Sequence, residues 1–167
     1  MGKHFNKAAR EQFALRMKEL ADFEAESVTS SGGAVYPGER CFKRMRGDFA
    51  EWVCLITSPK GYNDFFVECG YSRKGRFPHL SMRPSIYDLE SEVFSSEDEG
   101  FFRLRTTDEE FEHTWGCDSE ALLNGVVLEA GRPDLEKEEA ADIVNPLVDA
   151  AFEVLLTRGL PVLSRID

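Results

Sequence analysis

Residues 40–73 read RCFKRMRGDFAEWVCLITSPKGYNDFFVECGYSR, and this stretch decides the fold class. It contains three runs of β-like character, Cys41–Arg46, Trp52–Thr57 and Phe65–Tyr71, and the second and third are rich in aromatic and β-branched residues. Gly47-Asp48 separates the first two runs, and a longer polar turn separates the second from the third. Runs of this composition between turn-forming residues predict β-strands joined by hairpins. The sequence therefore predicts two consecutive antiparallel hairpins.

The third run also predicts which side of the sheet faces the core. Side chains alternate between the two faces along a strand. One face then carries Phe65, Val67, Cys69 and Tyr71, and the other carries Phe66, Glu68 and Gly70. The first face is the more apolar, and we expect it to be the core face.

A helix is predicted before the hairpins. Apolar residues recur there at steps of four and three, at Phe5, Ala9, Phe13, Met17 and Leu20. This spacing places them on one helical face. The leading helix is expected within residues 1–26, ending near Glu26, because residues 27–38 are rich in Ser and Gly and contain Pro37.

Further strands and several helices are expected after the hairpins. Residues 86–94 and 101–105 can extend the sheet, which then spans residues 40–105. The helical region is expected over residues 107–160. The whole chain, 1–167, is thus predicted to be one α+β domain, with an antiparallel sheet of about four to five strands.

Three signals divide the helical region. Thr107 and Glu110 have the spacing of a capping box, which predicts a short helix to about Trp115. A second helix, capped by Asp118 or Ser119, is expected to end at Gly131. A third opens at Asp134, and Asn145-Pro146 within it is read as a new helix start rather than a kink.

The acidic residues are concentrated in one part of the chain. Residues 1–87 hold 14 Lys and Arg against 10 Asp and Glu, whereas residues 88–142 hold 4 against 18. These counts give net charges of +4 and −14, and residues 143–167 add −1, which recovers the total of −11. A surface of this kind repels polyanions and attracts basic partners. Alternatively, these acidic residues only solvate the helices and keep the protein soluble.

The chain carries no sequence signal for a membrane or a cofactor. It has no apolar run near the ~20 residues of a membrane helix and no leading secretory segment, so a cytoplasmic protein is expected. The four cysteines form no C-x-x-C pair, and we expect reduced, mostly buried thiols. Phosphate-binding glycine motifs and the EF-hand pattern are absent, so no cofactor or metal is expected.

Two other classes of function remain open. The three histidines, His4, His79 and His113, form no helical metal pair, yet His79 or His113 with nearby carboxylates could serve a hydrolase or metal-dependent phosphoesterase. Alternatively, Leu147, Val154 and Leu155 could form the seam of a structural or adaptor subunit.

The net charge of the chain argues against nucleic-acid binding. Lys43, Arg44 and Arg46 alternate with aromatic residues, namely Phe42, Phe49 and Trp52. Cations interleaved with rings can bind phosphates and stack bases. Because the net charge of −11 opposes polyanions, an internal salt-bridge surface is the preferred interpretation of this group.

The segment Cys41–Tyr71 resembles an uncharacterised family of small bacterial domains that combine a leading helix with an antiparallel meander. The matching positions are Phe42, Arg44, Trp52, Ser58, Phe65, Val67 and Gly70. Residues 101–105 followed by Trp115 look like the family's arginine-rich strand and downstream tryptophan. The resemblance covers roughly residues 5 to 115 and implies a helix-flanked sheet with no established activity. Relatives of this sort often lie beside secreted toxins as immunity proteins.

These observations together predict a non-enzymatic binding protein, most specifically an immunity protein that occludes the cationic active-site cleft of a bacterial toxin. The partner is expected to be a basic protein, not a nucleic acid or a membrane, and the oligomeric state is left open. Carboxylates compete for a cationic cleft, while aromatic anchors supply specificity. The predicted partner-binding residues are Glu97, Asp98, Glu99, Asp108, Glu109, Glu110, Glu112 and, as the anchor, Trp115.

Overall fold

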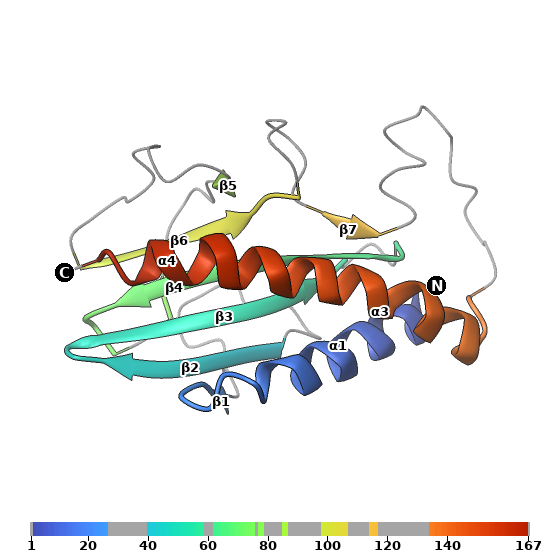
Figure 1. The fold of residues 1–167 in the computed structure, drawn as a ribbon, viewed down its shortest axis with the longest axis horizontal. Helices are drawn as coiled ribbons and strands as arrows, with labels where there is room; N and C mark the ends of the chain where they lie inside the picture. The colour runs from blue at the N-terminus through green and yellow to red at the C-terminus, as the bar shows by residue number, and fades with distance from the viewer. Residues whose placement is uncertain are drawn as a thin grey trace.

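A layer of helices lies against one face of a single β-sheet in the computed structural model (Figure 1). The fold is α+β, as the sequence predicts. The structure describes residues 2–26, 40–58, 62–75, 77–78, 85–86, 98–106, 114–116 and 134–166.

The sheet has seven strands in these described ranges. They are β1 (Glu24–Glu26), β2 (Arg40–Arg46), β3 (Phe49–Thr57), β4 (Asp64–Ser72), β5 (Ser85–Ile86), β6 (Glu99–Leu104) and β7 (Trp115–Gly116). Their order is β1-β2-β3-β4-β6-β5, and β7 pairs with the beginning of β4. All the pairs are antiparallel except the one between β5 and β6. The three strands predicted from residues 40–73 are therefore confirmed.

The turn between β2 and β3 shows why the first hairpin forms at Gly47-Asp48. Arg46 pairs with Phe49, so these two residues alone connect the strands. Gly47 has φ 58°, a left-handed value that glycine adopts without steric cost. A positive φ at the first of two turn residues is what a type II′ hairpin requires.

Both faces of the central strands are buried. The predicted core face of β4 is confirmed, because Phe65, Val67, Cys69 and Tyr71 are all at most 1% exposed and belong to the cluster that includes the helices. The opposite face is also covered, with a second cluster around Trp52. Each residue of β3 is buried, which makes this strand the centre of the fold.

The leading helix, α1 (Lys3–Met17), packs its predicted apolar face against the sheet. Phe5, Ala9, Phe13 and Met17 are its buried residues. The helix ends at Met17, however, and not near Glu26. Glu24–Glu26 forms β1 instead, because it pairs with β2 and because Glu26 accepts a hydrogen bond from the Trp52 indole at 2.9 Å. This long-range pairing outweighs the local helical pattern.

The C-terminal helical segment runs beside α1 in the same direction (Figure 1). It comprises α3 (Lys137–Val154), the π-helical turn η1 (Leu155–Gly159) and α4 (Leu160–Leu163). The Lys3 backbone N–H donates to Asp134 near the start of the pair, and Arg16 forms a 3.1 Å ion pair with Asp149 further along. None of the helices in the described ranges is long and apolar enough to cross a membrane.

Two of the predictions for the helical region are corrected within the described residues. One helical segment follows the sheet there, where several helices were predicted. Trp115, where the predicted short helix was expected to end, pairs with Phe65 as part of β7, and residues 107–113 of that prediction lie outside the described residues. The predicted helix that ends at Gly131 lies outside the described residues.

The proposed adaptor seam also packs inward. Leu155 is fully buried, and Leu147 and Val154 are partly buried against the core that contains α1 and the sheet. These contacts stabilise the fold of one chain, and of the three side chains only Leu147 and Val154 keep part of their surface exposed.

Pro146 lies inside α3, so the prediction of a new helix start at Asn145-Pro146 is wrong. Proline has no backbone N–H, and the carbonyl group of Asp142 therefore lacks its partner from the following turn. Asp142 and Pro146 are both exposed, so water can solvate that carbonyl group. Val144 and Val148 are fully buried on either side of Pro146, and their packing keeps the helix continuous.

Replacing Pro146 with alanine should therefore stabilise the protein. The helix regains a backbone hydrogen bond, and the gain is partly offset by a more flexible unfolded chain, so we expect about 1–2 kcal/mol. Urea unfolding measures the change. As a control, Asn145→Ala alters no backbone donor and should change stability by at most about 0.6 kcal/mol. A Pro146→Ala variant that is less stable than the wild type would contradict this account of the helix.

Candidate partner-binding surface

Three of the eight predicted partner-binding residues fall within the described residues. These three are Asp98, Glu99 and Trp115. The other five, Glu97, Asp108, Glu109, Glu110 and Glu112, lie outside the described residues, as do His79 and His113 of the enzymatic alternative.

Asp98 and Glu99 lie side by side at the start of β6 but have different environments. Asp98 is exposed, and its backbone carbonyl accepts a hydrogen bond from Arg73 at 2.8 Å. Glu99 is only 6% exposed, and its carboxylate forms a 3.2 Å ion pair with Lys74. Glu99 therefore presents little net charge to a partner, whereas Asp98 faces solvent.

Trp115 belongs to the core. Its ring is 5% exposed and stacks on Phe65 with centroids 6.0 Å apart. The next residue, Gly116, lies so close to Asn63 and Asp64 that a Cβ atom there would collide with their backbone. A tryptophan held in this way supports the junction of β7 with β4, so it is not available as the exposed anchor that the sequence suggested.

The basic residues of β2 form the internal salt-bridge surface that the sequence analysis favoured. The carboxylate of Glu51 is fully buried and accepts 2.6 Å hydrogen bonds from both Arg44 and Arg46. Arg46 also donates to the backbone carbonyls of Leu163 and Ile166. One buried carboxylate thus joins β3, through the two arginines of β2, to the end of the C-terminal helical segment.

Arg44 is the most strongly held of these cations. Burial lowers the pKa of its guanidinium, but hydrogen bonds to Glu51 and Asp22 outweigh burial and raise the pKa above its usual value. The guanidinium also lies over the Phe23 ring at 4.6 Å. A cation with this many internal contacts has little capacity left for an external phosphate.

The sheet face that points away from the helices contains two further charged clusters. Glu68 is 2% exposed and pairs with Arg103 at 2.9 Å, and Arg103 lies over the Phe66 ring at 3.6 Å. Glu26 pairs with Lys43 at 3.3 Å and accepts the hydrogen bond from Trp52. The rings that the sequence placed beside cations, Phe42, Phe49 and Trp52, are all at most 6% exposed. They are therefore not available to stack on bases.

The exposed carboxylates of α3 were not singled out by sequence reasoning. Glu138, Asp142, Asp149 and Glu153 follow one another at intervals of 4, 7 and 4 residues and are all exposed. We call these four residues the α3 acidic stripe. At 100° per residue they fall on one side of the helix, opposite the buried Ala140, Val144, Val148 and Ala151. The helical period of the carboxylates was the signal that could have revealed them.

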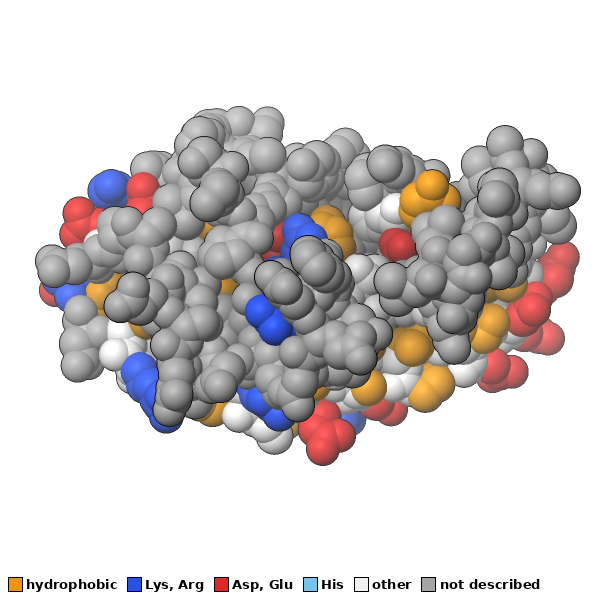
Figure 2. All heavy atoms as spheres, turned by 90° about the horizontal axis from the view of Figure 1, so that it is seen from above, with side chains coloured by type: hydrophobic (Ala, Val, Ile, Leu, Met, Phe, Trp, Pro, Cys, Tyr) orange, Lys and Arg blue, Asp and Glu red, His pale blue; other side chains and the backbone are white. Residues whose placement is uncertain are grey.

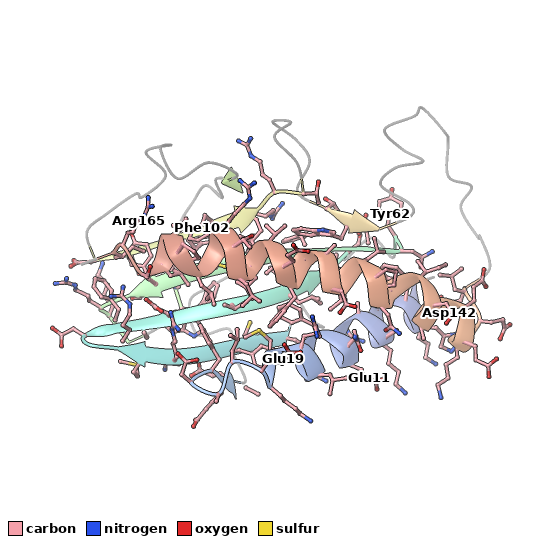
Figure 3. All side chains as sticks on the ribbon, in the orientation of Figure 1. Glu11, Glu19, Tyr62, Phe102, Asp142 and Arg165 are labelled. Atoms are coloured by element: carbon pink, nitrogen blue, oxygen red, sulfur yellow. The ribbon has the colours of Figure 1, made fainter. Side chains whose placement is uncertain are left out.

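The stripe is largely uncompensated. Asp149 pairs with Arg16, but Glu138, Asp142 and Glu153 form no ion pair within the described residues. Figure 2 shows Asp and Glu side chains gathered at the end of the molecule where α3 begins. In Figure 3, Asp142 lies on this part of α3, and Glu11 lies on the neighbouring α1.

The described residues contain no group of three His, Cys, Asp or Glu side chains that could hold a metal ion. Of the histidines, His4 contacts the backbone carbonyl of Leu135 at 2.7 Å, which fastens α1 to the residues before α3. Burial raises the pKa of Tyr71 to about 12 and also raises the pKa of Cys69, so both groups stay protonated near neutral pH.

Comparison with protein-family models, with curated proteins and with solved structures finds no match to this chain.

Proposed function

We propose that this chain is a non-enzymatic acidic binding protein whose partner is a cationic protein. In its most specific form, the proposal is an immunity protein that occludes the cationic active-site cleft of a bacterial toxin. One contrast supports it. Arg44, Arg46 and Arg103 of the sheet are paired internally with Glu51 or Glu68, whereas the α3 acidic stripe faces solvent with little compensation.

The stripe has the dimensions of a docking element. Its outer members are 15 residues apart, which corresponds to about 22 Å along a helix at 1.5 Å per residue. This length exceeds the Debye length of about 8 Å at physiological ionic strength, so only a partner with its own extended positive surface would feel all four charges. A cleft that binds a polyanionic substrate has such a surface.

Leu156 gives this surface an apolar contact in place of the buried Trp115. It is 42% exposed and follows Glu153 by three residues, at the end of the stripe. An apolar residue beside charged ones matches the usual organisation of an interface, in which apolar side chains are enclosed by a polar rim.

The proposal predicts that neutralising the stripe slows association. In Asp142→Asn/Glu153→Gln, two uncompensated charges are removed without touching the core. At low ionic strength, association with the cognate partner should slow roughly three- to tenfold, and the difference should shrink in high salt. Surface plasmon resonance at two salt concentrations measures both effects.

The matched control removes the same number of charges elsewhere. Glu24→Gln/Asp48→Asn changes two exposed carboxylates, in β1 and in the β2–β3 turn. Its association rate should stay close to that of the wild type. Cross-linking in the native organism identifies the partner. If the chain is an immunity protein, an equimolar amount of it must abolish the toxicity of that partner. Equal slowing by both variants, or a partner with an acidic surface, would overturn the proposal.

A further inference from the structure

Two cysteines face each other across the central hairpin. Cys41 in β2 is the register partner of Cys54 in β3. Directly opposed residues of antiparallel strands point to the same face, with Cα atoms roughly 4.5–5.5 Å apart. Disulfides span Cα separations of about 4.4–6.8 Å. The register alone therefore places these two thiols where one covalent bond can join them.

The pair lies on the sheet face that points away from the helices. Cys41 is 5% exposed and Cys54 is 1% exposed, and both belong to the cluster around Trp52. The third described cysteine, Cys69, lies on the other face and is opposed by Val53 and Phe102. Among the described residues, only Cys41 and Cys54 are opposed to each other.

Cys41 is the more accessible of the two because of its position in the sheet. Its neighbour on the outer side is Glu26, the last residue of the three-residue edge strand β1. Short edge strands open locally at a low cost in free energy. Cys54, in contrast, lies between β2 and β4 in the centre of the sheet. A reagent in solution should therefore reach Cys41 first.

We propose that Cys41 and Cys54 form a modification site, in which a low-molecular-weight disulfide converts the two thiols into an intramolecular disulfide. The Cys41 thiolate, having released its proton to water, attacks one sulfur of the reagent and expels one small thiolate. The Cys54 thiolate then attacks the Cys41 sulfur of this mixed disulfide and expels the second small thiolate. The protein loses two electrons and two protons, and the reagent is reduced to two thiols.

The bond would fasten the strand that holds the internal ion pairs. β2 carries Arg44 and Arg46, which bind Glu51 and, through Arg46, the carbonyls of Leu163 and Ile166. Linking β2 to β3 restricts the unfolded chain without changing the register of the folded one. The oxidised protein should therefore unfold at a higher temperature than the reduced protein, and a thiol reductant should reverse the shift.

Peptide mapping of the folded wild type tests the proposal. The protein is incubated with oxidised glutathione, remaining thiols are alkylated, and trypsin cuts the chain after Lys43, Arg44 and Arg46. Because these sites separate Cys41 from Cys54, the bond appears as two linked peptides in the mass spectrum. We expect this linked pair to form before Cys69 reacts.

Three variants control for other cysteines and for the order of attack. Cys117→Ala removes the one cysteine outside the described residues and should leave the linked pair unchanged, as should Cys69→Ala. Cys54→Ala should stop the reaction with glutathione still attached to Cys41. Three results in the wild type would overturn the proposal, namely a stable glutathione adduct on Cys41, a bond between any other pair, or thiols that react only after denaturation.

Discussion

Replacing Glu51 with glutamine is expected to lower the free energy of unfolding by about 3 kcal/mol, which corresponds to a fall in Tm of roughly 10 °C. The Glu51 carboxylate is fully buried and pairs with Arg44 and Arg46, whose side chains are 16% and 33% exposed. Glutamine has nearly the same shape but no charge, so Arg46 loses its paired carboxylate and Arg44 keeps only the exposed Asp22. Denaturant unfolding of the purified variant measures the loss.

An exposed ion pair provides the comparison for this prediction. Glu11 is 3.8 Å from Lys7 on α1, and both side chains are more than half exposed. Such pairs contribute little, so Glu11→Gln should change the free energy of unfolding by less than about 0.5 kcal/mol. If Glu51→Gln were equally mild, the buried ion pair would not be what fastens β2 to the C-terminal helical segment.

Glu51 also affects the surface charge, because it neutralises part of the positive charge of residues 1–87 inside the fold. Arg44 and Arg46 lie in residues 1–87, whose net charge is +4. In the structure their two positive charges are paired with the buried Glu51 and, for Arg44, with the exposed Asp22 as well. Glu99 shows the opposite case, since Lys74 neutralises a carboxylate that was expected to bind a partner. Counting charges along a sequence therefore does not show which charges are paired inside the fold and which reach the surface.

The strands of the hairpins were predictable because local chemistry fixes them. Gly47-Asp48 marks the turn, and the alternation from Phe65 to Tyr71 marks the core face. The same alternation carried a signal that was not used. Glu51 lies on the core face of β3, together with Phe49, Val53 and Leu55. A carboxylate on an otherwise apolar face of a strand predicts a buried ion pair.

The errors in the prediction arose where distant contacts override local preference. β1 exists because residues 24–26 pair with β2, and no local pattern in them indicates a strand. Pro146 stays inside α3 because buried valines on either side hold the helix together. Trp115 was assigned to the surface because acidic residues surround it in the sequence, but its ring packs against Phe65, which lies 50 residues earlier.

Trp115→Ala is the second change with a large expected effect. It tests whether Trp115 is a core residue or a partner-binding anchor. The ring is 5% exposed and stacks on the fully buried Phe65. Removing such a ring leaves a cavity and is expected to cost about 3 kcal/mol of unfolding free energy. Trp115→Phe retains an aromatic ring against Phe65 and should cost about 1 kcal/mol. Thermal and denaturant unfolding compare the two variants.

The alternative outcome for Trp115 is equally specific. An exposed anchor contributes to binding and little to folding, so Trp115→Ala would then unfold like the wild type while losing affinity for the partner. That result would indicate that Trp115 belongs to the binding surface, and it would contradict the packing of β7 on β4. A loss of stability in Trp115→Ala, with the affinity of Trp115→Phe unchanged, would instead leave the α3 acidic stripe and Leu156 as the surface that meets the partner.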